Sequence, residues 1–168
     1  MTGTPEISTI GIISPASPCR EDELLPGQAR LKNLGVSLEL FRAGKASEYL
    51  AGTDDERARI FRKATGLGFD ALLASRGGYG SARTIQRLEA DSFPVPSRPT
   101  YLMGFSDISA LLWRTLGKKN WVPVHSPNLL GLSQLDDESM AALGRFLPAP
   151  SDSMCFDLEP PAGRQTEG

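Results

Sequence analysis

The chain has 168 residues, of which 40% are hydrophobic and 23% charged, and its formal net charge at pH 7 is −2. This composition predicts a globular domain with a real core, and the lack of a basic excess argues against nucleic-acid binding. No apolar run reaches membrane-spanning length and the N-terminus has no secretory leader pattern, so we expect a cytoplasmic protein without membrane contact. Two distant cysteines, outside metal-ligand spacing, predict reduced thiols, and we expect no metal and no cofactor.

The order of apolar residues predicts strands that alternate with helices. Strands are predicted at 9–14, 36–41, 69–74, 101–104 and 121–124. Helices are predicted from near Pro26 or slightly earlier to Leu34, behind the capping box Thr53–Glu56 as far as Gly66 or Gly68, after Gly80, after Ser106, and over 136–147. The inward residues are expected to be Ala82, Ile85 and Leu88 in the third helix and Met140, Ala141, Leu143 and Phe146 in the last. This alternation predicts an α/β fold with an open, mostly parallel, doubly wound sheet of the Rossmann or flavodoxin kind and helices on both faces.

The domain organisation is expected to be simple. One α/β domain is predicted over 1–158, with 155–158 as a possible edge strand. The stretch 159–168 reads as a linker. Neither an internal repeat nor a low-complexity segment is found, so a single folding unit accounts for the patterned part of the chain.

Four loops follow the carboxyl ends of predicted strands: 14–18, 75–80, 106–107 and 125–127. In open parallel sheets, ligands bind beyond the carboxyl ends of the strands. These loops also hold most of the unusual residues of the chain. Their convergence predicts a functional site at this edge of the sheet.

Ser106 follows an apolar run that ends at Gly104 and precedes a helical pattern. A tight strand-to-helix turn of this kind is how a nucleophile elbow exposes its hydroxyl, and the amide of Asp107 would face the same space. Ile108 replaces the last glycine of the full G-x-S-x-G pattern. Serine is also a favoured N-cap residue, so a capping role remains the alternative to a nucleophile.

The loop Arg76–Gly80 has three glycines in four positions. It matches neither the dinucleotide-binding fingerprint nor a P-loop. Two alternatives remain: the loop donates amides to an oxyanion, or it only makes tight turns. His125 is the single histidine of the chain and ends the fifth strand, so it is either a base for Ser106 or a structural residue.

Five segments together resemble the N-terminal half of the LD-carboxypeptidase family, which includes muramoyltetrapeptide carboxypeptidases and microcin-C immunity peptidases. The segments are 12–17 (IISPAS), 51–57 (AGTDDER), 75–83 (SRGGYGSAR), 104–111 (GFSDISAL) and 124–127 (VHSP). Their order and spacing match the family over nearly the whole chain. The pair of R-G-G-Y-G and G-F-S-D-I is the most specific part of the resemblance.

The resemblance implies a serine peptidase that cleaves an L,D-amide bond next to a free carboxylate, as in the release of D-alanine from murein tetrapeptides during cell-wall recycling. Ser106 would be the nucleophile, and the amides of Asp107 and of Gly77 or Gly78 would form the oxyanion hole. The implied substrate-binding residues are Arg76, Tyr79, His125 and Ser126. A small muropeptide-like substrate and a homodimer of the full-length protein are the implied partners.

Two departures from the family pattern matter. Ser126 stands where family members commonly have glycine, which would narrow the pocket slightly. The family's glutamate and histidine partners of the serine lie in a C-terminal domain, and His125 matches a different family position. The chain alone is therefore expected to be inactive, and three alternatives stay open: a non-catalytic muropeptide- or partner-binding domain, a microcin-C-type immunity peptidase, and a doubly wound nucleotide-binding domain that the loop sequence disfavours.

Overall fold

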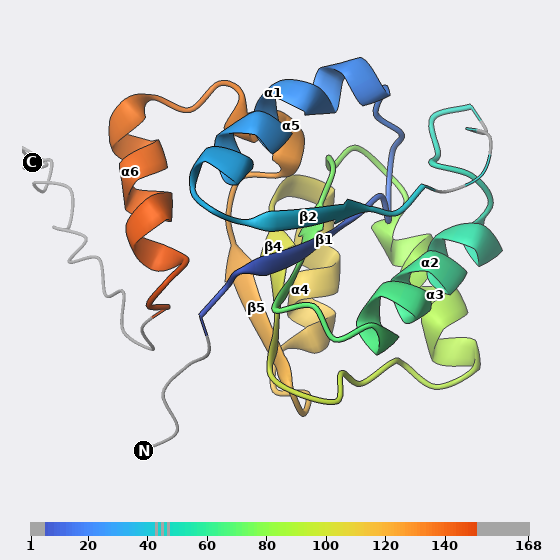
Figure 1. Cartoon of the computed structure of the whole chain (residues 1–168). Helices are drawn as coiled ribbons and strands as arrows, with labels where there is room; N and C mark the ends of the chain where they lie inside the picture. The colour runs from blue at the N-terminus through green and yellow to red at the C-terminus, as the bar shows by residue number, and fades with distance from the viewer. Residues whose placement is uncertain (1–5, 43, 45, 47, 151–168) are drawn as a thin grey trace, which may run out of the picture.

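The computed structural model describes residues 6–42, 44, 46 and 48–150 and places five strands and seven helical segments among them (Figure 1). The strands are β1 (Thr9–Ile13), β2 (Ser37–Leu40), β3 (Ala71–Ala74), β4 (Thr100–Gly104) and β5 (Trp121–His125). The helices are α1 (Glu21–Asn33), α2 (Asp54–Gly66), α3 (Ser81–Ala90), the short 3₁₀ helix η1 (Ser106–Ile108), α4 (Ser109–Thr115), α5 (Leu129–Leu132) and α6 (Asp137–Phe146).

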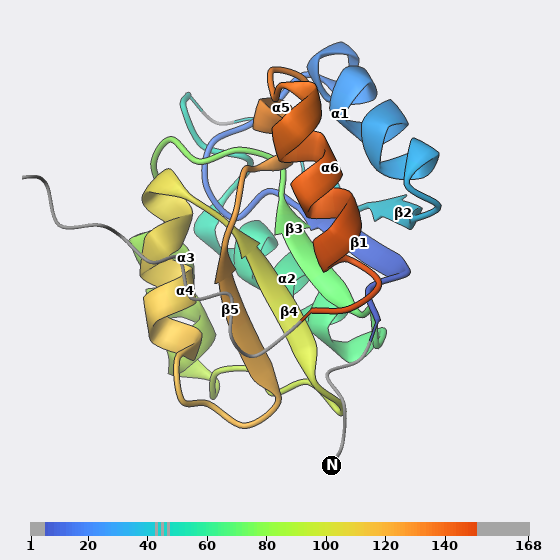
Figure 2. The same cartoon turned by 90° about the vertical axis from the view of Figure 1, so that its left-hand side faces the viewer.

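The five strands form one sheet in the order β2-β1-β3-β4-β5, and every neighbouring pair is parallel. Ile10 of β1 lies in register with Leu38 of β2 on one side and Ala71 of β3 on the other. Helices α1, α5 and α6 cover one face of the sheet, and α2, α3 and α4 cover the other (Figures 1 and 2). The predicted parallel, doubly wound α/β fold is therefore confirmed, and its strand order is that of flavodoxin-like domains.

The core has two layers because successive strand side chains point to opposite faces. Ile12 and Leu73 pack with the cluster under α1, α5 and α6, whereas Ile13 and Leu72 pack with the cluster under α2, α3 and α4. Strands β1, β3 and β4 are buried on both sides, which explains their continuous apolar sequences. Burial from both faces holds the carboxyl ends of these strands at one edge.

Local sequence signals fix several helix boundaries. Thr53 caps α2, since its hydroxyl accepts a hydrogen bond from the Glu56 amide at 3.2 Å and the Glu56 carboxylate accepts one from the Thr53 amide at 2.8 Å. Helix α1 starts at Glu21 with one half of a capping box, since the Arg20 amide donates to the Glu23 carboxylate at 2.9 Å, whereas the arginine side chain offers no acceptor. This explains why α1 begins five residues before Pro26, which lies inside the helix.

Three details differ from the sequence-based expectations. In α3 the buried residues are Ser81, Thr84 and Leu88, and Ala82 is exposed. Ala141 of α6 is also exposed, although Met140, Leu143 and Phe146 of that helix are partly buried as expected. The short α5 was not anticipated. The possible strand at 155–158, the linker at 159–168 and the domain boundary between them lie outside the described residues.

No helix in the described ranges is both long and apolar enough to span a membrane.

Candidate functional site

Ser106 occupies the turn between β4 and the helical segments that follow it. Its φ is +64°, in the left-handed region that non-glycine residues seldom adopt. Phe105, with φ −149° and ψ −176°, is the N-cap of η1, and Ser106 is its first residue. Backbone strain of this kind at a polar residue is characteristic of functional sites.

The side chain of Ser106 is exposed and available. Within the described part of the chain no group hydrogen-bonds its hydroxyl, and η1 has no side-chain cap. The alternative in which Ser106 serves as an N-cap therefore has no hydrogen bond to support it. The geometry leaves the hydroxyl free to meet a ligand.

The glycine loop that follows β3 lies directly against Ser106. A Cβ on Gly77 would lie 3.0 Å from Cβ of Ser106, 3.1 Å from its Oγ and 3.4 Å from the amide nitrogen of Asp107. Any side chain here would crowd the serine hydroxyl. This close approach favours glycine at position 77, because a Cβ there would force Ser106 or the loop to shift, and no turn rule alone would indicate this.

Ser17 fixes the shape of the same loop. Its amide donates to the Gly77 carbonyl at 3.3 Å, and its hydroxyl accepts a hydrogen bond from the Tyr79 amide at 3.1 Å. Gly78 has a φ of +101°, and a Cβ there would lie 2.2 Å from Ser17 Oγ. In the described ranges the amides of Gly77 and Gly78 have no hydrogen-bond acceptor, so these donors are available to a ligand.

Asp107 connects the turn at Ser106 to helix α3. Its carboxylate accepts a hydrogen bond from the Ser81 amide at 2.9 Å. The N-cap of α3 is Gly80, which has no side chain to accept that amide. Asp107 thus provides the anionic cap that the helix N-terminus favours, and the contact ties the end of β4 to the end of the glycine loop.

A fully buried arginine, Arg57, joins the elements that surround the glycine loop. Arg57 donates from Nη1 to the Gly52 carbonyl at 2.7 Å and from Nε to Thr84 Oγ1 at 3.0 Å, and it pairs with Asp54. Thr84 in turn donates to the Pro15 carbonyl at 2.8 Å. These contacts join α2, α3 and the loop after β1, which accounts for the burial of a charged side chain.

His125 and Ser126 lie at the end of β5. The imidazole of His125 is exposed and makes an edge-on contact with Phe105, with 6.3 Å between ring centroids. No hydrogen bond joins it to Ser106 in the described ranges, so the structure does not support His125 as the base of Ser106. The Ser126 amide donates to the Gly104 carbonyl at 3.1 Å. His125 and Ser126 both border an apolar cavity of about 430 Å³.

Arg76 and Tyr79 flank the glycines of the loop. Arg76 donates from Nη1 to the Pro18 carbonyl at 3.4 Å. Tyr79 is about half exposed and packs edge-on against Tyr49, with 5.4 Å between ring centroids. The structure therefore places all the predicted site residues at the carboxyl edge of the sheet, with Ser106, Asp107 and Gly77 in closest association.

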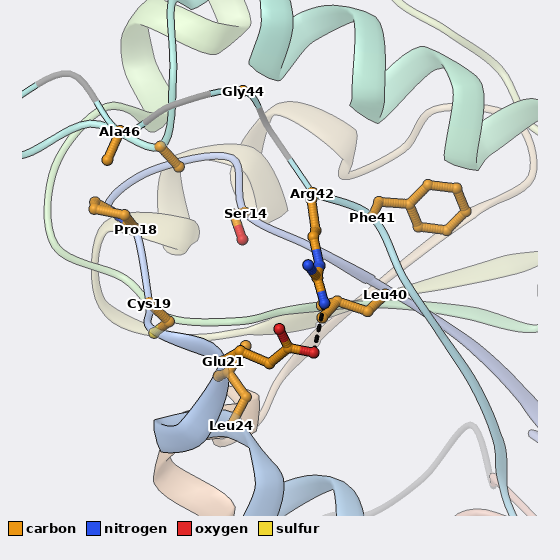
Figure 3. Close-up of a pocket in the computed structure, with 11 residues that line it drawn as sticks. Ser14, Pro18, Cys19, Glu21, Leu24, Leu40, Phe41, Arg42, Gly44 and Ala46 are labelled. Atoms are coloured by element: carbon orange, nitrogen blue, oxygen red, sulfur yellow. Dashed lines mark hydrogen bonds and ion pairs between the residues drawn. The ribbon is translucent and has the colours of Figure 1, made fainter.

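A separate cavity of about 270 Å³ opens at the carboxyl ends of β1 and β2 (Figure 3). Glu21 and Arg42 form an ion pair across it, and Cys19 faces it from the loop after β1 (Figure 3). Burial raises the pKa of the Cys19 thiol, which disfavours the reactive thiolate. Ser106 is not among the residues that line this cavity.

Sequence reasoning missed two residues of the site, Ser17 and Asn128. Asn128 is buried, and its Oδ1 accepts a hydrogen bond from the Phe105 amide at 3.1 Å. Ser17 lay inside a segment used for the family resemblance, but its contact with the glycine loop spans 62 positions. Neither contact has a local sequence signal.

The fold and the site together define an open parallel α/β domain whose conspicuous polar groups gather where such domains bind small molecules. The family model of the LD-carboxypeptidase N-terminal domain matches residues 10–126. The chain belongs to the LD-carboxypeptidase family, as its motifs predicted.

Curated relatives support this assignment. A Synechocystis sp. protein assigned as a carboxypeptidase is 35% identical over 136 residues, which cover 79% of this chain and 44% of the relative. A Bacillus subtilis protein assigned as a murein peptide carboxypeptidase is 33% identical over 131 residues, which cover 77% of this chain and 40% of that relative. The chain therefore spans less than half the length of these relatives.

Solved structures show the same fold. The microcin C7 self-immunity protein MccF in its wild-type apo state aligns with a TM-score of 0.75 at 22% identity, covering 91% of this chain and 48% of MccF. The muramoyltetrapeptide carboxypeptidase of Oxalobacter formigenes aligns with a TM-score of 0.58 at 25% identity, and the alignment covers 72% of this chain and 40% of that enzyme.

Proposed function

We propose that this chain is the nucleophile-bearing domain of a serine-type LD-carboxypeptidase. The observation that carries the proposal is Ser106. Its backbone φ is +64°, its exposed hydroxyl has no hydrogen bond to any described residue, and it lies directly beside Gly77. In the proposed reaction, Ser106 Oγ attacks the carbonyl carbon of an amide next to a free carboxylate. An acyl-enzyme forms as the amine leaves, and water then releases the acid.

The backbone amides near Ser106 would stabilise the oxyanion of this reaction. Gly77 and Gly78 have amides without acceptors in the described ranges, and the amide of Asp107 lies next to the serine. Donors that are fixed before the reaction stabilise a developing negative charge without reorganisation. This supports a role for Asp107 with Gly77 or Gly78 as the oxyanion hole.

The proposed substrate is a small muropeptide-like peptide. The B. subtilis relative is assigned as a murein peptide carboxypeptidase, which favours cleavage of a murein tetrapeptide to a tripeptide and D-alanine. In this proposal, Arg76 and Tyr79 on the glycine loop, with His125 and Ser126 at the end of β5, would contact such a ligand. An arginine beside the site also suits the free carboxylate.

Microcin-C-type immunity activity is a second candidate. It is suggested by the likeness to MccF, and some of those structures hold aminoacyl sulfamoyl nucleosides. Comparing hydrolysis of a murein tetrapeptide with that of an aminoacyl sulfamoyl nucleoside separates the two candidates.

The general base is proposed to come from outside residues 1–168. His125 is the single histidine of the chain and has no hydrogen bond to Ser106. The resemblance to the family supplies a glutamate and a histidine from a C-terminal domain, and the curated relatives are more than twice as long as the matched region. In this proposal the complete protein acts in the cytoplasm as a homodimer.

Replacement of Ser106 tests the proposed function. Ser106→Ala in the complete native protein should abolish D-alanine release, because no acyl-enzyme can form, while substrate binding persists. Loss of one exposed hydroxyl should change the melting temperature little. Ser109→Ala, an exposed serine three positions on, is the matched control and should keep full activity. Retained turnover in Ser106→Ala would reject Ser106 as the nucleophile.

A further inference from the structure

The segment 126–130 runs across the carboxyl edge of the sheet and binds to the ends of two strands. The Ser126 amide donates to the Gly104 carbonyl at the end of β4 at 3.1 Å. The Leu130 amide donates at 3.0 Å to the carbonyl of Ser75, which follows β3 and precedes the glycine loop. One short segment therefore contacts both strand ends that lead to the proposed oxyanion donors: the end of β4, before Asp107, and Ser75, before the glycine loop.

Asn128 is the centre of this segment. Its side chain is 3% exposed, and its Oδ1 accepts the hydrogen bond of the Phe105 amide at 3.1 Å. A Cβ on Gly104 would lie only 2.8 Å from that Oδ1. The amide oxygen thus occupies space that only a glycine at position 104 leaves open, and it holds the Gly104–Phe105 peptide, one residue before Ser106.

We propose that Asn128 is a positioning residue of the serine site. It holds the Gly104–Phe105 peptide, which leads into Ser106, in the orientation that aims the Ser106 hydroxyl at the carbon and the Asp107 amide at the oxygen of one substrate carbonyl. This inference rests on the proposed function of Ser106. Asn128 itself touches no reacting atom in this proposal.

The physical reason lies in the strain at Ser106. A residue with φ near +60° relaxes unless its neighbours hold it in place. Phe105 is 41% exposed and its ring makes an edge-on contact with His125, so its side chain anchors the backbone weakly. The hydrogen bond from its amide to a buried acceptor is the fixed point on the β4 side of the turn, and Asp107 provides the one on the α3 side.

Two measurements test the proposal. The first is hydrogen–deuterium exchange of the Phe105 amide in the 168-residue chain, which needs no catalysis. Asn128→Leu should speed this exchange roughly tenfold, the effect of losing one buried hydrogen bond. The second is steady-state hydrolysis by the complete native protein. There Asn128→Leu should lower kcat by about 10- to 100-fold, because misplacing a reacting group costs up to that much, while KM changes little.

Variants at two asparagines provide the controls. Asn128→Asp keeps an oxygen at the Oδ1 position, so it should restore slow exchange of the Phe105 amide and raise kcat above that of Asn128→Leu. If Asn128→Leu does not fold, Asn128→Ala is the second variant that removes the hydrogen bond to the Phe105 amide. Asn120→Leu removes a hydrogen bond to the Pro96 carbonyl, 2.8 Å long, at the opposite end of β5. It should lower the melting temperature and leave both measurements unchanged.

Three results would overturn the positioning role. Unchanged exchange of the Phe105 amide in both Asn128→Leu and Asn128→Ala would show that the hydrogen bond holds nothing. Unchanged kcat despite faster exchange would show that the held peptide is not needed. An equal loss of kcat in Asn120→Leu would show a general effect of destabilisation. Failure of the proposed function is distinguishable, since Ser106→Ala would then stay active while the exchange at Phe105 still responded to Asn128.

Discussion

At the scale of single residues, the close approach of Gly77 to Ser106 limits the size of the side chain that position 77 can carry. The serine has left-handed backbone geometry, which costs a non-glycine residue about 1–2 kcal/mol. Its hydroxyl is accessible because the residue facing it has no side chain. The left-handed backbone of Ser106 and the absence of a Cβ at Gly77 together leave the Ser106 hydroxyl room to meet a ligand.

Gly77→Ala tests this space. The new methyl group would lie about 3 Å from Ser106 Cβ and Oγ, so the serine or the loop must shift. We expect kcat of the complete protein to fall by about 10- to 100-fold, with a smaller effect on stability. Activity and melting temperature should be measured on the same preparation.

Gly66→Ala is the matched control for this change. Gly66 ends α2, and a Cβ there would meet no atom within 4 Å. Alanine in a helix is favoured over glycine by up to about 1 kcal/mol, so this variant should be slightly more stable and fully active. Equal activity of the two variants would contradict the importance of the contact between Gly77 and Ser106.

At the scale of elements, Asp70 joins β1 to β3 at the amino edge of the sheet, opposite the site. Its Oδ2 accepts hydrogen bonds from the amide and the hydroxyl of Thr9, each 2.7 Å long, and its Oδ1 pairs with Arg98 at 2.8 Å. Burial by itself would raise the pKa of Asp70, but the hydrogen bonds from Thr9, Arg98 and Ser8 lower it to about 2. The carboxylate thus stabilises the fold only while it is ionised.

The pH dependence of stability follows from this shift. Because the pKa in the folded state lies below the ordinary 3.8, the ionised Asp70 adds stability above about pH 4, and this stability is lost as the pH falls toward 2. The pKa difference corresponds to about 2 kcal/mol. Asp70→Asn should therefore be less stable than the native chain at pH 7 by about that amount.

Urea unfolding at pH 7 and at pH 2 measures the difference between the two proteins. The gap should close at pH 2, where the native Asp70 is also becoming protonated. Asp137→Asn, at an exposed position in the first turn of α6, is the control and should show no comparable gap at pH 7. A gap of equal size at both pH values would contradict a role for the ionised carboxylate.

On the scale of the whole molecule, the chain holds a candidate nucleophile and candidate oxyanion donors, and no base is hydrogen-bonded to the serine among the residues that the structure describes. A serine hydroxyl without an activating base is a weak nucleophile at neutral pH. We therefore expect purified residues 1–168 to release little or no D-alanine from a murein tetrapeptide. The complete native protein, assayed in parallel, should be active.

A direct assay of D-alanine release tests whether residues 1–168 are active alone. The Ser106→Ala form of the 168-residue chain sets the background. Robust turnover by the unmodified chain above that background would contradict the prediction and would make His125 the candidate base, since no other imidazole is present.

The sequence by itself determined the architecture. The strand and helix order is set by apolar periodicity, and the start of α2 by the local capping box at Thr53 and Glu56, because these signals act within a few residues. The rule that parallel strands end at one edge then placed Ser106, Gly77 and His125 together without any knowledge of contacts. The short α5 and the exposed face of Ala82 were not predictable in this way, since packing against distant elements decides them.

Only the tertiary structure decided how the site is held. Asn128 binds the Phe105 amide across 23 positions, Asp107 caps a helix 26 positions earlier, and the buried Arg57 bridges to Thr84 across 27. Polar side chains such as these have no periodic signal, because their partners become neighbours only once the sheet has formed. The left-handed conformation of Ser106 and the preference for glycine at position 77 likewise follow from close approach between separate loops, a property of the folded chain rather than of either segment.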